Sequence, residues 1–281
     1  MPRTTDREIE PQTTAPQGAT SRPPSRALLL SEFRALPELG LFGAWLPTLF
    51  ATAPRGDGQP VMVLPGLATS DTSTIALRRF LRSLGYPVKG WALGRNLGPL
   101  PGIEDGMKDN LARLADEHGR KVSLVGWSLG GIYARQLAKL MPDHVRQVVT
   151  LGSPFNGDPR ATNAWKLYQF ASGHKVDDRD RHLGGAIAAA PKVPTTAIYS
   201  RTDGVCAWRN CIEEPAPNTE NIEVHGSHCG LGHNPLAVHA IADRLAQPEG
   251  AWRRFTRNGL RALVYPRPFD GETSAAVPAP A

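Results

Sequence analysis

Cysteine is scarce in this chain of 281 residues, which has three: Cys206, Cys211 and Cys229. Three is too few, and an odd number, for a disulfide framework. Cys211 and Cys229 lie near two loops discussed below and could approach each other, although inert buried thiols explain them equally well. No cysteine has a companion at the spacing of a metal-binding motif, so the sequence predicts neither a metal site nor a cofactor.

A long hydrophobic run is also missing. Residues 1–26 are rich in Thr, Pro, Gln and Arg and lack the apolar core of a signal peptide, which predicts a disordered leader. Residues 39–54 are uncharged and apolar, but this stretch is too short for a membrane span and contains Pro47. We therefore expect a cytoplasmic protein, with peripheral membrane contact as the open alternative.

Acidic residues are absent from residues 251–269, where five arginines carry most of the net charge of +6. Charge gathered in one terminal segment argues against a nucleic-acid-binding face, which needs basic residues along a groove or stripe of the fold. We expect residues 251–281 to form a basic, low-complexity tail. Weak attraction of this tail to an anionic membrane surface is the alternative.

Between these ends, short apolar runs typical of strands alternate with longer runs at helical spacing. The predicted strands are residues 61–64, 88–93, 122–125, 145–151, 195–200 and 222–224. The predicted helices are residues 73–84, 104–117, 132–140, 164–170 and 236–245. This alternation predicts an α/β fold over residues 54–250, with a mostly parallel central sheet of about six strands and helices on both faces.

Two segments depart from the alternation. Residues 27–53 carry apolar side chains at mainly helical spacing, which predicts amphipathic helices, and packing on the core is favoured over membrane docking. Residues 155–193 contain no clear strand, which predicts a cap insertion above the sheet, with an ordinary surface loop as the alternative.

The most informative segment is Gly126-Trp127-Ser128-Leu129-Gly130-Gly131, which directly follows the apolar run of residues 122–125. A strand, a sharp turn with a serine between glycines, and then a helix is the pattern of a nucleophile elbow. Gly126 and Gly130 leave space where side chains would collide in such a turn. Ser128 is therefore the candidate nucleophile, and an ordinary strand-to-helix crossover is the alternative.

An acid and a base follow in the order that such a serine needs. Asp203 comes just after the predicted strand 195–200, where it could orient a histidine and stabilise the imidazolium. His228 lies in a glycine-flanked loop after the last predicted strand and is the candidate general base, with His225 and His233 as alternatives. The order serine, aspartate, histidine differs from that of chymotrypsin-like and subtilisin-like enzymes.

The backbone N–H groups of Leu129, next after the serine, and of Leu67, in the loop after the first strand, are the candidate oxyanion hole. Trp127, Arg95 and Asn96 are candidates for contacting the substrate. A purely structural role for Arg95 and Asn96, tying down a Gly/Pro-rich loop, is equally consistent with the sequence.

Together, four segments resemble those of bacterial α/β-hydrolases of the esterase/lipase type: residues 64–67, 126–131, 201–204 and 226–230. The resemblance covers about residues 60–246 and implies the α/β-hydrolase fold, with the helices of residues 27–53 in place of the usual first strand pair. It also implies hydrolysis of a small-molecule or lipid carboxylic ester through a serine acyl-enzyme. Many relatives have His-Gly where this chain has Pro65-Gly66, which bears on the oxyanion contact.

Two other functions stay open at this point. An acyltransferase or thioesterase can use the same three residues, and a hydrolase-fold protein can bind ligands without catalysis. The sequence predicts no particular oligomeric state.

Overall fold

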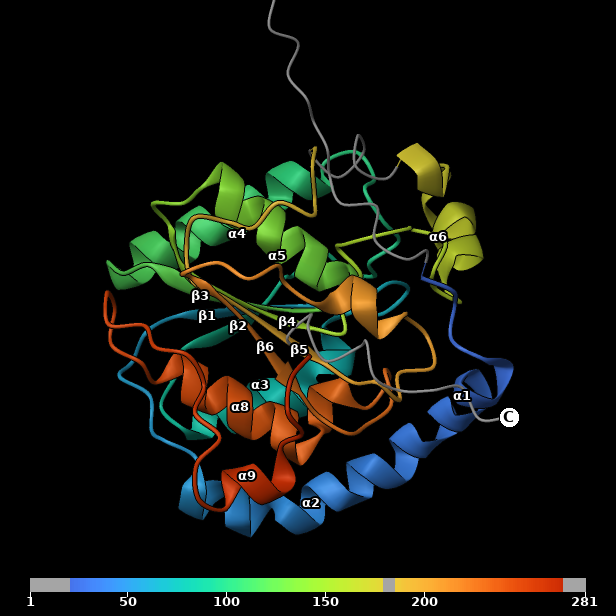
Figure 1. Cartoon of the computed structure of the whole chain (residues 1–281). Helices are drawn as coiled ribbons and strands as arrows, with labels where there is room; N and C mark the ends of the chain where they lie inside the picture. The colour runs from blue at the N-terminus through green and yellow to red at the C-terminus, as the bar shows by residue number, and fades with distance from the viewer. Residues whose placement is uncertain (1–20, 179–184, 270–281) are drawn as a thin grey trace, which may run out of the picture.

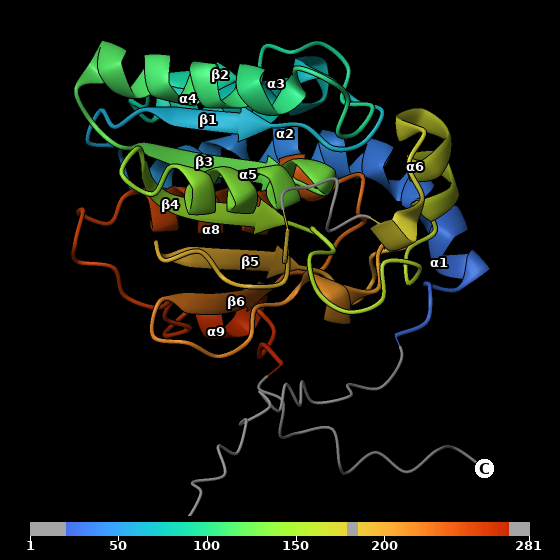
Figure 2. The same ribbon diagram turned by 90° about the horizontal axis from the view of Figure 1, so that it is seen from above.

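A six-stranded parallel sheet in the order β2-β1-β3-β4-β5-β6 forms the centre of the molecule (Figure 2). The computed structural model describes residues 21–178 and 185–269. The strands are β1 (Val61–Leu64), β2 (Val88–Gly90), β3 (Val122–Trp127), β4 (Val145–Leu151), β5 (Thr195–Tyr199) and β6 (Thr219–Glu223). Val63 pairs with Val125, and Gly126 pairs with Thr150, so the carboxyl ends of the central strands meet at one edge of the sheet.

Helices cover both faces of the sheet (Figures 1 and 2). The helices are α1 (Arg26–Leu30), α2 (Ala35–Thr52), α3 (Ile75–Ser83), α4 (Ile103–His118), α5 (Leu129–Leu140), α6 (Trp165–Ser172), α8 (Pro235–Leu245) and α9 (Arg261–Val264). Short 3₁₀ turns are η1 (Ser31–Arg34), η2 (Asp71–Thr74), η3 (Val176–Asp178), η4 (Trp208–Cys211) and η5 (Leu231–His233).

Two hydrophobic cores follow from the alternation of side chains along the strands. Val63, Val125 and Val149 face the core under α3 and α8. Their neighbours Leu64 and Leu124 face the core under α4 and α5. Because both faces are covered, the central strands β1 and β3 are almost entirely apolar. The α/β class, the parallel sheet of six strands and the helices that precede β1 in place of a strand pair are confirmed.

Most of residues 27–53 is helical and α2 packs on the core, as the sequence predicts, but the exposed side of α2 is apolar as well. Only Phe42 and Leu49 of α2 are buried, and both pack in the core that contains α3 and α8. The other large apolar side chains of α1, η1 and α2 are partly or largely exposed. Within residues 21–178 and 185–269, no helix has the length and hydrophobicity that a membrane span requires.

Between β4 and β5, α6 and η3 stand beyond the carboxyl edge of the sheet, on the same side of the molecule as α1 (Figures 1 and 2). This is the segment for which the sequence predicts a cap insertion, and residues 179–184 of it lie outside the described residues. Most of the predicted leader and residues 270–281 of the predicted tail lie outside them as well.

Candidate active site

Ser128 sits at the turn between β3 and α5 with φ 53° and ψ −121°, in the left-handed region that non-glycine residues rarely adopt. A Cβ at Gly126 would overlap the carbonyl of Gly130, and a Cβ at Gly130 would overlap the carbonyl of Leu64. The Ser128 N–H donates to the Leu151 carbonyl of β4 at 2.8 Å, which fixes the turn against the sheet. Such held strain is typical of functional turns, and this geometry is that of a nucleophile elbow.

Asp203 and His228 form a buried pair at the same edge of the sheet. The Oδ2 atom of Asp203 lies 2.6 Å from Nδ1 of His228. The Oδ1 atom of Asp203 accepts hydrogen bonds from the backbone N–H groups of Val205 at 2.8 Å and Cys206 at 2.7 Å. The carboxylate is therefore held on both oxygens, and one of them is directed at the imidazole.

The other two histidines near this edge are placed differently. His233 lies with Nε2 3.0 Å from the carbonyl oxygen of Ala35, and His225 is exposed beside α2. Of the three candidates for the base, His228 is the one that contacts the carboxylate of Asp203.

The electrostatics of the pair favour a charged imidazole. Burial alone would lower the pKa of His228, but the Asp203 carboxylate raises that pKa well above its ordinary value, with a contribution from the Cys206 thiol. The protonated form of His228 is thus stabilised, as a histidine that accepts a proton from a nucleophile requires.

Ser128 and His228 are not hydrogen bonded to each other in this structure, and Ser128 instead lines a pocket with Cys206, the neighbour of the pair. Catalytic hydrogen bonds are often long without substrate and tighten when it binds.

Gly152 follows β4 with φ 52°, and a Cβ there would stand 3.0 Å from His228 Nδ1 and 3.1 Å from Asp203 Oδ2. The absence of a side chain at Gly152 makes room for the pair, a role that sequence reasoning missed.

The pocket beside Ser128 is small, about 60 Å³, and mostly apolar. Its lining residues are Leu67, Ser128, Leu129, Ile132, Pro154, Pro159, Thr162, Ala164, Trp165, Tyr168, Val176 and Cys206. Both expected oxyanion residues, Leu67 and Leu129, are therefore next to the serine. Within the described part of the chain, no protein group accepts the backbone N–H of Leu67, and Leu129 begins α5, where N–H groups lack partners within the helix.

The residues expected to touch substrate do not line this pocket. Asn96 is fully buried, donates through Nδ2 to the Pro65 carbonyl at 2.8 Å and accepts from the Gly98 N–H at 3.2 Å, so it supports the loop of Leu67. Arg95 is exposed. The indole Nε1–H of Trp127 donates to the carbonyl of His228 at 3.1 Å and so supports the loop that contains His228, which we call the base loop.

Cys206 completes a buried cluster with Asp203 and His228 whose potential metal-ligand atoms lie within 4.8 Å of one another. The 2.6 Å contact between carboxylate and imidazole is a hydrogen-bond distance, whereas two ligands of one tetrahedral zinc ion stand roughly 3.3 Å apart. The arrangement therefore fits an acid–base pair better than a metal site. A hydrogen bond from Cys211 lowers the pKa of the Cys206 thiol, against the effect of its burial.

The sequence left open whether Cys211 and Cys229 approach each other or are both inert buried thiols, and in the structure Cys211 is buried and Cys229 exposed. Cys211 lies with Cys206 in a small core beside Tyr199, because η4 folds back over the end of β5. Cys229 is exposed in the base loop, and all three cysteines are free.

Two carboxylates of the N-terminal segment, Glu32 and Glu38, hold the loops of Asp203 and His228, and sequence reasoning missed both. Glu32 Oε1 accepts from the N–H of His228 at 2.9 Å and from the N–H of Gly204 at 2.7 Å, while its Oε2 accepts from the N–H of Cys229 at 2.8 Å. Glu38 accepts from the N–H of Ser227 at 3.0 Å and from its hydroxyl. Glu32 and Glu38 are the only acidic residues between residues 27 and 56, a signal that the sequence did offer.

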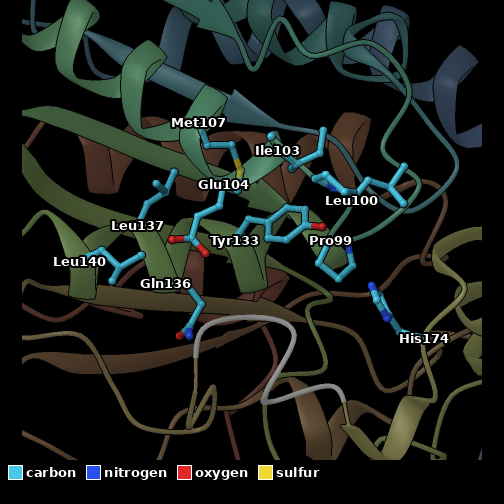
Figure 3. A pocket seen from close by; sticks show the side chains of 12 residues that line it. Pro99, Leu100, Ile103, Glu104, Met107, Tyr133, Gln136, Leu137, Leu140 and His174 are labelled. Carbon is cyan, nitrogen blue, oxygen red and sulfur yellow. The ribbon is translucent and has the colours of Figure 1, made fainter.

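A larger cavity, of about 400 Å³, lies away from the serine (Figure 3). It lies between α4 and α5, where side chains of Ile103 and Met107 from one helix and of Tyr133 and Leu137 from the other line it. It contains none of the expected catalytic residues. We therefore place the candidate active site at the smaller pocket beside Ser128, because the nucleophile candidate lies there, and not at the larger cavity.

Comparisons with known proteins agree with this architecture. Residues 107–179 match a family model described as a PGAP1-like alpha/beta domain, which covers less than half of the chain. A comparison with curated proteins found no match.

Three solved structures share the fold. Lipase B of Aspergillus fumigatus gives a TM-score of 0.51 at 18% identity, over 72% of this chain and 56% of that chain, so under two thirds of that lipase is matched. A structure of the metagenome-derived lipolytic enzymes LipS and LipT gives 0.52 at 14% identity, over 69% of this chain and 95% of that chain. A lipase of Bacillus licheniformis in mature form gives 0.50 at 18% identity, over 70% and 95%. At such identities the likeness shows the fold alone.

Proposed function

We propose that this chain, which has the α/β-hydrolase fold of those lipolytic enzymes, is a serine hydrolase that cleaves carboxylic esters. The observation that carries the proposal is the 2.6 Å contact between Asp203 and His228 at the sheet edge where Ser128 occupies its strained turn. Fold alone does not set function, so the argument rests on these residues.

In the proposed reaction, Ser128 Oγ attacks the acyl carbonyl while His228 Nε2 takes its proton. Asp203 holds Nδ1 of the imidazole, which fixes the tautomer and stabilises the imidazolium. The N–H groups of Leu67 and Leu129 stabilise the oxyanion of the tetrahedral intermediate. His228 then protonates the leaving alcohol and activates the water that hydrolyses the acyl-enzyme.

The pocket supports an apolar acyl group of limited length. Its walls next to Ser128 are mostly hydrocarbon and aromatic, with Ile132, Trp165 and Tyr168 among them. Apolar walls of this kind favour a short or medium acyl chain over a charged group.

The test is hydrolysis of nitrophenyl esters of increasing acyl length by the full chain, with Ser128→Ala as the variant. We expect turnover that falls with long acyl chains, and a loss of at least about a thousandfold in Ser128→Ala. Ser83→Ala, an exposed serine at the end of α3, is the matched control and should keep full activity.

Parallel assays with acyl thioesters distinguish the related functions. Turnover confined to thioesters would overturn the ester assignment. Activity that persists in Ser128→Ala would remove Ser128 as the nucleophile, and no turnover of either class would favour a binding protein.

A further inference from the structure

The outward side of the N-terminal helices is covered with exposed apolar side chains. Phe33 is 77% exposed and Leu36 75% exposed, and the segment carries six further exposed large apolar residues: Leu29, Leu30, Leu39, Leu41, Trp45 and Phe50. In α2, Leu36, Leu39, Gly43, Pro47 and Phe50 recur every three or four residues and so share one side of the helix. We call this surface of α1, η1 and α2 the outer face.

Charge is missing from the outer face of α2. The only charged residue of that helix is Glu38, and it points inward to Ser227. Soluble helices that meet water normally carry polar residues on that side, and a helix that is apolar all round is normally buried. Exposed large apolar side chains that gather on one side of a segment are typical of an interaction site.

The C-terminal segment extends this surface and adds positive charge. In Figure 1, α9 lies beside α2, and Leu41, Trp45 and Val264 line one groove between them. Leu263 of α9 is 81% exposed. The surrounding segment, residues 251–269, contains five arginines and no acid; Arg253, Arg254 and Arg267 are exposed, whereas Arg261 is paired with Asp243 of α8 at 2.7 Å. The exposed Arg26 and Arg55 stand near the two ends of the α1–α2 segment.

We propose that the outer face docks on the surface of an anionic lipid bilayer. The inner side of α2 is committed to the protein through Phe42, Leu49 and Glu38, so the helix would lie in the membrane plane with its outer side among the acyl chains. The exposed arginines of the C-terminal segment would be attracted to anionic headgroups, and this attraction would add to the free energy gained by burying the apolar side chains. A second copy of the chain is a poorer occupant, since a symmetric contact would bring like-charged segments together.

Docking would also connect the membrane to the catalytic loops. The helices that carry the outer face hold the N–H groups of Ser227, His228 and Cys229 through Glu38 and Glu32 on their inner side. The docking proposal itself does not depend on the proposed esterase function, and its test uses no substrate.

The experiment is sedimentation of the full chain with large unilamellar vesicles, either of phosphatidylcholine alone or of equimolar phosphatidylcholine and phosphatidylglycerol. We expect binding to the anionic vesicles that weakens with added salt, and weaker binding to the neutral ones. Leu36→Ser should lower the partition coefficient at least about fivefold, because it removes one inserted side chain.

Leu140→Ser is the matched control, since Leu140 is 48% exposed at the end of α5, on the opposite side of the sheet. It should bind as the unaltered chain does. Equal binding of Leu36→Ser, equal binding to neutral vesicles, or no binding of the unaltered chain would overturn the proposal. A dimer in analytical ultracentrifugation that Leu36→Ser dissociates would also overturn it and would assign the outer face to a second copy.

Discussion

Glu32 and His228 are 196 residues apart in sequence, yet the Oε1 atom of Glu32 accepts the backbone N–H of His228 at 2.9 Å. The same carboxylate also binds the N–H of Gly204, directly after Asp203. Charge-assisted hydrogen bonds of this kind are roughly twice as strong as neutral ones. One residue of the N-terminal segment thus joins the acid loop to the base loop.

Glu32→Ala should lower kcat for a small ester by about ten- to a hundredfold with little change in KM. The reason is that three backbone N–H groups lose their acceptor and the imidazole is no longer held in place. Glu32→Gln keeps one oxygen acceptor and should recover part of the rate. Steady-state kinetics, together with the pH profile of kcat/KM, measure the effect.

Glu104→Ala is the control for this prediction, because Glu104 is half exposed and pairs with Lys108 on α4, away from the catalytic loops. A purely structural role of Glu32 would lower the unfolding temperature and leave the kcat of the folded fraction unchanged. That result would contradict the positioning role.

Gly152→Ala should abolish most of the activity, by about a hundredfold or more, because the new Cβ would displace His228 and Asp203. Gly119→Ala has a comparable backbone cost, with φ 58° against 52°, but its Cβ would meet nothing within 4 Å. Gly152→Ala should lose more stability than Gly119→Ala in denaturant titrations, because its Cβ would also stand 2.8 Å from Cδ1 of the buried Leu231. The turnover of the folded proteins should differ sharply between the two variants. Equal turnover of the two would show that the space beside the pair is unimportant.

Activity should increase with pH from neutrality upward, because the base must be uncharged and Asp203 raises the pKa of His228 well above its ordinary value. Asp203→Asn removes that carboxylate charge. Its kcat/KM should fall by about ten-thousandfold, with the inflection moved to lower pH. The pH profiles of kcat/KM for the unaltered chain and for Asp203→Asn measure this shift of the inflection. If the inflection stays at the same pH, it belongs to a group other than His228.

The stability of the fold should also depend on pH, through the same raised pKa of His228. Because the pKa of His228 is raised in the folded state, the pair stabilises the fold fully below about pH 6.5, the unfolded value, and loses this contribution as pH rises through the folded value. The difference in unfolding free energy between the unaltered chain and Asp203→Asn should therefore shrink on the alkaline side. A constant difference across that range would contradict the assignment.

Arg135→Met should destabilise the fold by about 3–5 kcal/mol, because it leaves Glu213 buried without its cationic partner. Arg135 also donates to the carbonyl of Ala188 at 2.9 Å and lies 3.7 Å from the centre of the Phe155 ring. The double variant Arg135→Met/Glu213→Leu should recover much of the loss. Chemical denaturation of the unaltered chain and the two variants measures the free energy of unfolding. A double variant that is even less stable than Arg135→Met would contradict the coupling between Arg135 and Glu213.

The sequence predicted the sheet well because its strands are apolar and its helices periodic. One end each of β2 and β6 was misplaced by three residues, for physical reasons. β2 stops at Gly90, since the N–H groups of Trp91 and Ala92 bind the Asp71 carboxylate at 3.0 and 3.1 Å instead of continuing the strand. β6 begins at Thr219, where Glu220 is buried and paired with Arg244 at 2.9 Å, a polar start that periodicity does not reveal.

The supporting residues of the site were beyond sequence reasoning for a different reason. Glu32 and Gly152 act through contacts between distant segments, and neither belongs to a local motif. Trp127 was singled out next to the serine, but in the structure it supports the loop of His228. Asn96 was singled out after a predicted strand, and in the structure it supports the loop of Leu67, in line with the structural alternative. The candidate catalytic residues can be predicted from local sequence patterns, whereas the contacts that position them depend on the tertiary fold.

The most direct test of the central claim is covalent labelling with a fluorophosphonate, followed by mass spectrometry of the peptide that contains Ser128. We expect a single phosphonyl adduct on Ser128, no adduct in Ser128→Ala, and labelling slowed strongly in the His228→Ala variant, because the serine needs its base. An adduct elsewhere, or undiminished labelling of Ser128→Ala, would contradict the assignment of Ser128 as the nucleophile.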